Sequence, residues 1–236
     1  MTRMLCAIPA RGGSKRLPGK NILPLAGRPM LAYSIQAALD TGLFDAVYVC
    51  TDDQAIADVA QRFGAEVPFL MPPELCDDLV PSHQPCQHLA QVLGNSGDIY
   101  ETLLCLQPSS PLRSVEDIVE AVRCWQDNDV DYVVSATFVD PHYFHWALQP
   151  PVRDDDFWHM YFGKQYLKER PLLPPVYRPN GSIKIARLSA LMEEGSFFGE
   201  RLGVVETPEE RSIHVATQFD FDLCQYLLDN LQNRER

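Results

Sequence analysis

The residues of this chain best suited to chemistry form a cationic loop near the N-terminus. Two adjacent glycines, Gly12 and Gly13, let backbone N–H groups turn toward a ligand, because no Cβ stands in the way. In a chain with a formal net charge of -12, so local a cluster of cations calls for an anionic ligand, and a polyphosphate is the simplest one. The cations of this loop are Arg11, Lys15, Arg16 and Lys20.

The loop fits neither of the standard phosphate-binding motifs. It lacks the second glycine before a Lys-Ser or Lys-Thr pair that G-x-x-x-x-G-K-[ST] requires, and it does not contain G-x-G-x-x-G. Residue types alone therefore leave two interpretations open: a phosphate-binding loop, or a solvated basic turn between a strand and a helix.

Apolar runs typical of buried strands alternate with amphipathic helical patterns through the first 140 residues. This alternation predicts an α/β fold, a single Rossmann-like domain over residues 1–236 with a mostly parallel, helix-flanked sheet. Ligands of such sheets bind beyond the carboxyl ends of the strands. The expected strands are 4–8, 46–50, 66–70, 102–106, 132–136, 182–186 and 204–205, and the expected helices are 30–39, 54–63, 85–93, 115–128, 190–194 and 219–231.

The pattern changes between residues 140 and 175, which are rich in proline and aromatic residues and show no clear period. A loop of this length usually serves binding or association. We interpret residues 140–175 as an insertion that forms a dimerisation arm and also reaches into a neighbouring active site. A plain surface loop is the alternative, but it would leave many bulky rings in water.

Composition and charge narrow the function classes. A sequence pI near 4.8 argues against a nucleic-acid partner, and the absence of a long apolar run argues against a membrane span. The seven cysteines are odd in number and form no C-x-x-C pair, so we expect core fillers in a reducing compartment. Together with the lack of a signal-like N-terminal segment, this favours a cytoplasmic protein.

The stretch from Ile8 to Asn21 resembles the N-terminal signature of the sugar-activating cytidylyltransferases, and is most similar to that of the acylneuraminate group, which makes CMP-sialic or CMP-legionaminic acid. Further stretches keep the family's order along nearly the whole chain. Each is weak alone, and their order and spacing together are specific. They are Gly27-Arg28-Pro29-Met30, Thr51-Asp52-Asp53, Gly64-Ala65-Glu66-Val67-Pro68-Phe69-Leu70, Leu106-Gln107-Pro108-Ser109-Ser110-Pro111-Leu112-Arg113, Tyr177-Arg178-Pro179-Asn180-Gly181-Ser182, Phe197-Phe198-Gly199-Glu200 and Pro208-Glu209-Glu210-Arg211-Ser212-Ile213.

The resemblance implies a nucleotide-diphospho-sugar transferase-like fold and a homodimer that serves surface polysaccharide biosynthesis. It implies that CTP and a nine-carbon 2-keto-3-deoxy sugar acid, a nonulosonic acid, react to a CMP-sugar and pyrophosphate. It also implies roles for individual residues: catalytic Arg11, Lys20 and Arg170; nucleotide-binding Ala10, Arg11, Gly12, Lys15, Lys20, Asn21 and Ser82; sugar-binding Gln107, Arg170, Asn180 and Gly181.

Several of these assignments compete with structural interpretations. Arg170 stands eight residues before Arg178, the family spacing for a cation near the sugar carboxylate, but it could also be a solvated residue of the arm. Arg113 has two equally good interpretations: it is a cation at the entry of a helix, or it contacts a ligand. One of the two carboxylates Asp52 and Asp53 is expected only to cap the following helix.

The chain departs from the family pattern where the resemblance implies magnesium ligands. The family's D-x-D is replaced by His214-Val215-Ala216, and neither an imidazole nor a methyl group is a good ligand for this hard cation. Met71 also replaces a common arginine. Mg²⁺ is still expected as a cofactor, with Asp220, Asp222 or Asp52 as substitute ligands. The alternative is a catalytically weakened or silent nucleotide-binding relative of such an enzyme.

Overall fold

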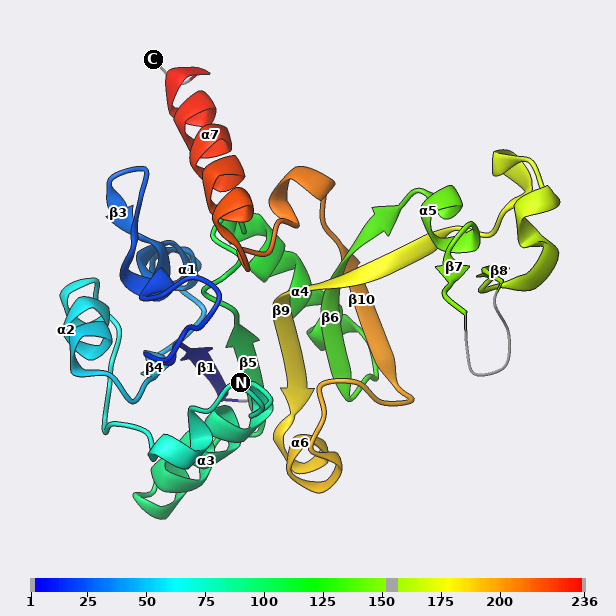
Figure 1. The fold of residues 1–236 in the computed structure, drawn as a ribbon. Helices are drawn as coiled ribbons and strands as arrows, with labels where there is room; N and C mark the ends of the chain where they lie inside the picture. Colours follow the sequence, from blue (N-terminus) through cyan, green and yellow to red (C-terminus); the bar gives the residue numbers. More distant parts are fainter. Residues whose placement is uncertain (1–2, 152–156, 235–236) are drawn as a thin grey trace.

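A six-stranded sheet forms the centre of the computed structural model, which describes residues 3–151 and 157–234 (Figure 1). The strand order is β10-β6-β9-β5-β1-β4. Only β9 runs antiparallel to its neighbours, so the predicted mostly parallel sheet is confirmed. The strands are β1 (Met4–Pro9), β4 (Val47–Cys50), β5 (Thr102–Leu106), β6 (Tyr132–Val139), β9 (Val176–Arg187) and β10 (Leu202–Glu206).

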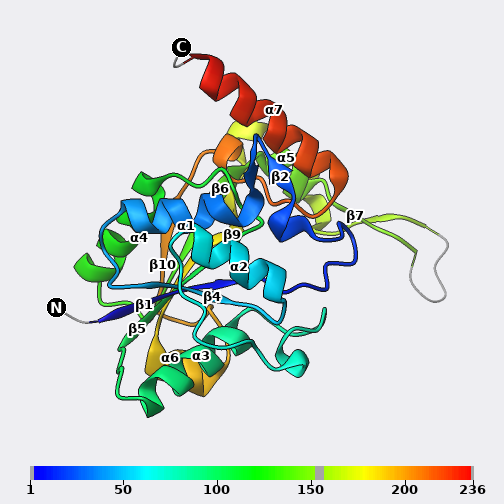
Figure 2. The same cartoon turned by 90° about the vertical axis from the view of Figure 1, so that its left-hand side faces the viewer.

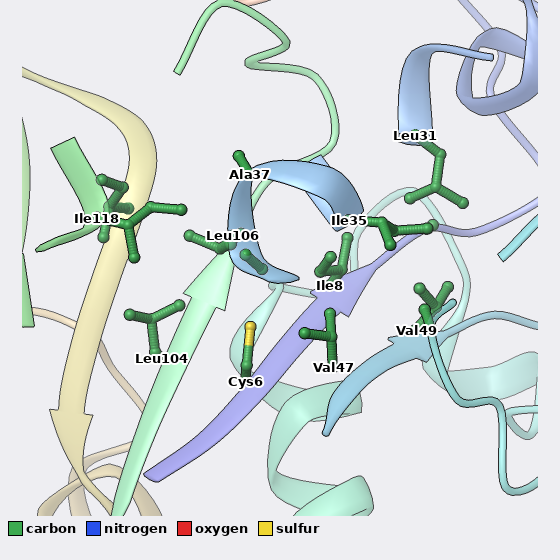
Figure 3. Close-up of a cluster of buried hydrophobic side chains, with 14 of the residues drawn as sticks. Cys6, Ile8, Leu31, Ile35, Ala37, Val47, Val49, Leu104, Leu106 and Ile118 are labelled. Carbon is green, nitrogen blue, oxygen red and sulfur yellow. The ribbon is translucent and has the colours of Figure 1, made fainter. Parts of the chain in front are cut away.

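Helices cover both faces of this sheet (Figure 2). Because successive side chains of a strand point to opposite faces, Cys6 and Ile8 of β1 pack in one core cluster and Leu5 and Ala7 in another. The first cluster lies under α1 (Met30–Asp40), α2 (Gln54–Arg62) and α4 (Val115–Asp127), and Figure 3 shows part of it. The second lies under α3 (His83–Asn95) and α6 (Leu188–Glu194).

A third, smaller cluster anchors the C-terminal helix. Cys224 of α7 (Gln218–Arg234) and Val215, just before it, pack with Leu25 of the short hairpin β2 (Pro24–Leu25) and β3 (Arg28–Pro29). The far end of α7 runs away from the sheet (Figure 1). The beginning of α7 therefore lies close to the N-terminal loop, whereas its end does not.

One predicted strand is wrong. Residues 66–70 form no strand, and only Glu66 bridges to Tyr48 of β4. Pro68 explains the difference, because a proline cannot donate the backbone hydrogen bond that continues a ladder. The other predicted elements are present with shifted ends, and residues 182–186 are the second half of the longer β9.

Residues 140–175, which the sequence predicts to be an insertion, extend from one end of the sheet (Figure 1), and their described part contains only short elements. Many apolar side chains of the insertion are exposed, among them Tyr143, Trp158 and Tyr161. Residues 152–156 of the predicted insertion lie outside the described part. Its elements are α5 (Pro141–His145), β7 (Leu148–Gln149), β8 (His159–Met160), and the 3-10 turns η3 (Gly163–Leu167) and η4 (Arg170–Leu172).

No helix in residues 3–151 and 157–234 combines the length and the apolar character needed to cross a bilayer.

Candidate active site

A pocket lies at the sheet edge where the parallel strands β1, β4 and β5 end. It is lined by residues that end or follow each of these strands: Ala10 and Arg11 after β1, Cys50 at the end of β4, and Gln107 after β5. A second pocket adjoins it and shares Arg11, Lys20, Ser14 and Asp78 with it. This is the edge where the sequence predicted ligand binding.

The cationic loop is held in place from behind by the loop that follows β4. The Gly12 N–H donates to Asp52 Oδ1 at 2.8 Å, whereas Asp53 Oδ1 accepts from Ala55 N and Ile56 N and so caps α2. A Cβ at Gly12 would lie 2.8 Å from Asp53 Oδ2. Asp53 is thus the carboxylate that caps the helix, whereas Asp52 holds the cationic loop. Gly12 is required because a side chain would prevent the two loops from packing this closely.

Asn21 closes the loop on itself, since its Nδ2 donates to the Arg11 carbonyl oxygen at 3.0 Å. Two polar atoms of the loop stay buried without a protein partner among the described residues, Arg11 Nη1 and Asn21 Oδ1. Because a buried polar group without a hydrogen bond is costly, such atoms on a pocket wall indicate groups that await a ligand.

The cations of the loop face the pocket with two different partners. Lys20 Nζ donates to the Val215 carbonyl oxygen at 3.1 Å, and burial, then the charges of Arg16 and Arg11, lower the pKa of Lys20. Arg11 and Lys15 both form ion pairs with Asp78, the latter at 2.7 Å. Hydrogen bonds from Lys15 and Arg11 lower the pKa of Asp78. A carboxylate therefore lies between two of the predicted phosphate ligands.

The same pocket is also lined by residues predicted for the base and the sugar. Ser82, at the start of α3, and Gln107, after β5, line the same pocket as Arg11. The Gln107 N–H donates to the Ser182 carbonyl oxygen at 3.2 Å, which fixes its backbone to β9. Six predicted site residues thus line one pocket, namely Ala10, Arg11, Lys20, Asn21, Ser82 and Gln107, and Lys15 lines the adjoining one. His214 and Ala216, which replace the expected magnesium ligands, line the first and the second pocket respectively.

Other predicted residues do not reach this pocket with their side chains. Asn180 is buried, its Oδ1 accepts from Ser135 Oγ and Ser182 N, and its Nδ2 donates to Thr207 and Ser212. Its amide is thus fully used inside the fold, and with Gly181, which has a φ of 73°, it shapes a turn of β9. Asn180 can therefore affect the pocket only indirectly, through the conformation of β9.

Two arginines also have internal partners. Arg170 lies in the insertion, where it forms an ion pair with Asp140 at 2.8 Å and is mostly exposed. Arg113 is buried and donates to Ser182 Oγ, Ser34 Oγ and the Gln107 carbonyl oxygen, and burial lowers its pKa to about 10. Arg113 directly precedes Ser114, the N-cap of α4, so the interpretation as a cation at a helix entry is confirmed, and its guanidinium also joins the end of β5 to β9.

The comparisons with known proteins fit this geometry. A family model described as Cytidylyltransferase matches residues 5–188, most of the chain. The chain belongs to the cytidylyltransferase family. It is 30% identical to a pseudaminic acid cytidylyltransferase of Campylobacter jejuni, over 94% of this chain and 95% of that protein. It is 36% identical to an N-acylneuraminate cytidylyltransferase of Streptococcus agalactiae, over 92% of this chain and 51% of that longer protein.

A solved structure shares the fold of this cytidylyltransferase at low sequence identity. It is that of CMP:2-keto-3-deoxy-manno-octonic acid synthetase complexed with CTP, with a TM-score of 0.72 and 17% identity, covering 97% of this chain and 99% of that one. The nucleotidyltransferase-like fold predicted from the sequence is therefore confirmed.

The residues at the family's metal-binding positions do not fit a protein-bound Mg²⁺ in this cytidylyltransferase. His214 Nδ1 lies 3.1 Å from Ser109 Oγ, and Ala216 offers no ligand. Burial of the ring against the loop, and then the charges of Lys20 and Arg16, lower the pKa of His214 to about 4. The neighbouring cations Lys20 and Arg16 also repel a divalent cation at this position.

The carboxylates predicted as substitute magnesium ligands also accept hydrogen bonds within the protein. Asp220 Oδ2 accepts from Ala216 N, Thr217 N and Thr217 Oγ1 and so begins α7, Asp222 Oδ1 accepts from Gln218, and Asp52 holds Gly12. Within residues 3–151 and 157–234, no three His, Cys, Asp or Glu side chains form a group that could hold a metal. In the described part of the chain, the carboxylates predicted as substitute ligands are therefore already used in hydrogen bonds within the protein.

Sequence reasoning missed three participants in the site. Asp78 pairs with two of the loop cations, Ser109 holds His214, and Lys184 donates to Ser82. Ser109 lies within a motif stretch that was recognised, so its place at the pocket was foreseeable. The partners of Asp78 and Lys184 lie more than 60 residues away in sequence, and no local pattern indicates such pairs.

Proposed function

We propose that this cytidylyltransferase transfers CMP from CTP to a nonulosonic acid, a nine-carbon 2-keto-3-deoxy sugar acid, and releases pyrophosphate. The observation that carries the proposal is the pocket at the ends of β1, β4 and β5, into which the loop presents Lys20 and the unpartnered Arg11 Nη1. Family membership supports CTP as the nucleotide, and the names of the two relatives support a sugar acid as the acceptor.

In the proposed reaction the anomeric hydroxyl oxygen of the sugar acid forms a bond to the α-phosphorus of CTP. The bond from that phosphorus to the bridging oxygen breaks, pyrophosphate leaves, and the hydroxyl proton passes to solvent. Arg11 and Lys20 bind the phosphates, and Lys15 lies toward the leaving pyrophosphate. Such cations stabilise the charge that develops on the phosphate oxygens, and the protein otherwise positions the reactants.

We assign the two walls of the pocket to the two substrates. Ser82 and the neighbouring Cys76 and Val80 face the cytosine, and Asn21 faces the nucleotide. Gln107 faces the sugar, and Asn180 and Gly181 position it through β9. The particular nonulosonic acid is not specified, since the two relatives are named for different ones.

We further propose that the chain acts as a homodimer in the cytoplasm. The exposed aromatic side chains of the insertion support a second copy as the partner, which would bring Arg170 to a neighbouring site. The cytoplasmic assignment is supported by the seven cysteines, none of which forms a disulfide. We expect Mg²⁺ to accompany CTP as its counter-ion, with its ligands from the nucleotide.

A pyrophosphate-release assay with CTP, Mg²⁺ and a panel of nonulosonic acids tests the proposal. We expect turnover with at least one acid, and a loss of roughly a hundredfold or more in Arg11→Ala, since one missing charge-stabilising donor typically costs that much. CTP binding without product from any acid would instead support the silent relative, an alternative that no comparison favours. An Arg11→Ala variant with full turnover would overturn the phosphate assignment.

A further inference from the structure

Lys184 is a cation next to this site, in contact with the pocket residue Ser82, and the proposed function gives it no role. It lies on β9, where it pairs in register with Cys105 of β5 and with Val134 of β6. Its Nζ donates to Ser82 Oγ at 3.2 Å and lies 5.4 Å from the centre of the Phe197 ring. Lys184 is half-buried and Phe197 is buried, so an ammonium group stands against an apolar wall beside a residue of the pocket.

The ammonium group of Lys184 has no acidic partner among the described residues. No carboxylate forms an ion pair with Lys184 in the described part of the chain, whereas Arg11, Lys15, Arg170, Arg187 and Arg211 each have one. An ammonium carries three N–H donors, and the contacts around Lys184 use one of them for a neutral hydroxyl. A partly buried cation that keeps free donors and no counter-charge is suited to bind an anion.

The position of Lys184 in the sheet indicates which anion it would bind. Cys105 and Gln107 are two residues apart and so point to the same face of β5, and Gln107 Nε2 contacts Cys105 Sγ at 4.0 Å. Lys184 pairs with Cys105 on that same face and reaches Ser82 across the pocket wall. It therefore lies between Ser82, assigned to the cytosine, and the Cys105 that Gln107 contacts, whereas the loop cations lie on the phosphate side.

We propose that Lys184 binds the carboxylate of the acceptor sugar acid. The inference rests on the proposed function, since it needs a sugar acid beside Gln107. Within one chain Lys184 supplies the cation that the resemblance assigned to Arg170, which is paired with Asp140 in the insertion. Lys184 is thus a specificity residue that favours an acid over a neutral sugar of the same shape.

The competing explanation is that Lys184 only holds Ser82 and, through it, the nucleotide. The two roles differ in the substrate that they affect. A carboxylate-binding lysine changes the KM for the sugar acid and leaves CTP binding intact. A lysine that only supports Ser82 changes CTP binding, as Ser82→Ala would, and is indifferent to the charge of the sugar.

Steady-state kinetics with a sugar acid and with its methyl ester, in wild type, Lys184→Met and Lys184→Arg, separates these roles. We expect Lys184→Met to raise the KM for the acid roughly ten- to hundredfold, the range for a lost hydrogen bond to a charged group. The KM for the ester should be nearly unchanged, and Lys184→Arg should recover much of the acid preference. Arg62→Met, which removes an exposed cation on α2, is the matched control, and CTP binding by calorimetry reports on folding.

The outcomes distinguish this inference from the proposed function. If wild type turns over an acid, but Lys184→Met affects acid and ester equally or weakens CTP binding as Ser82→Ala does, the carboxylate assignment is overturned and the function stands. If Arg170→Met and not Lys184→Met removes the preference for the acid, the carboxylate belongs to Arg170. If wild type turns over no sugar acid, the proposed function itself fails and this inference fails with it.

Discussion

At the scale of single residues, the key feature is a carboxylate that occupies the space between two phosphate-binding cations. Asp78 pairs with Arg11 and Lys15 and lines both adjoining pockets. A triphosphate that binds these cations must displace Asp78, because two anions cannot share the same partners without repulsion. Asp78 is thus an internal anion that competes with the nucleotide for Arg11 and Lys15.

Replacement of Asp78 by asparagine should therefore tighten CTP binding. We expect the Kd of Asp78→Asn for CTP to fall about fivefold at low salt, since the variant removes a competing unit charge. Isothermal titration calorimetry measures the change, with Asp58→Asn, an exposed carboxylate on α2 that lines neither pocket, as the control for a general change in charge. Weaker binding by Asp78→Asn would mean that this carboxylate orients Arg11 for the phosphates.

At the scale of elements, the close contact between the cationic loop and the loop after β4 fixes the site. A methyl group at Gly12 would lie 2.8 Å from Asp53 Oδ2 and 2.9 Å from its Cβ, whereas Gly13 has no atom within 4 Å of the corresponding position. Gly12→Ala should therefore destabilise the fold by about 1–3 kcal/mol, the usual cost of overpacking. It should also weaken CTP binding.

Gly13→Ala is the matched control for Gly12→Ala. It adds the same methyl group one residue later in the same loop, so its unfolding midpoint in urea should be close to that of wild type. Equal effects of the two substitutions would show that the loop is not held by packing against Asp53.

The segment before α7 also shapes the site, because its residues 214–216 lie against the cationic loop. We expect Ala216→Asp to lower the Mg²⁺ concentration at half-saturation of the CTP-bound protein roughly tenfold, since it adds a charged oxygen ligand. A Mg²⁺ titration of the thermal midpoint, with CTP present, measures this, and the neutral Ala216→Asn is the control. An unchanged midpoint would indicate that the new carboxylate pairs with Lys20 or that the metal binds elsewhere.

The sequence predicts elements better than it predicts partners. The alternation of apolar runs was enough to predict β1, β5 and the helices. It wrongly predicted a strand at residues 66–70, because Pro68 interrupts the backbone pairing. The hydrogen bonds of Arg113 and Asn180 could not be predicted, since they reach Ser182 and Ser135, 69 and 45 residues away. A family motif can therefore assign such a residue to a ligand although its side chain makes its hydrogen bonds inside the fold.

At the scale of the whole molecule, the exposed aromatic surface of the insertion predicts self-association. Trp158 and Tyr161 are 63% and 62% exposed, although large apolar side chains usually lie in cores or interfaces. We expect Trp158→Ser to weaken a dimer by roughly thirtyfold or more, as loss of an aromatic hot spot does. Sedimentation velocity over a concentration series measures it, and Phe219→Ser on α7, another exposed aromatic, is the control.

A wild-type chain that stays monomeric at high concentration would contradict the dimer. It would also leave Arg170 without a neighbouring site to enter, since within one chain Arg170 is paired with Asp140.

The central claim is that the cationic loop after β1 binds the triphosphate of CTP, and a structure of the protein with CTP tests it most directly. We predict phosphate oxygens within hydrogen-bonding distance of Arg11 Nη1 and Lys20 Nζ, the cytosine near Ser82, and Asp78 displaced from Arg11. A nucleotide bound away from this loop, for example in the cavity beside Tyr226 and Leu112, would contradict the account.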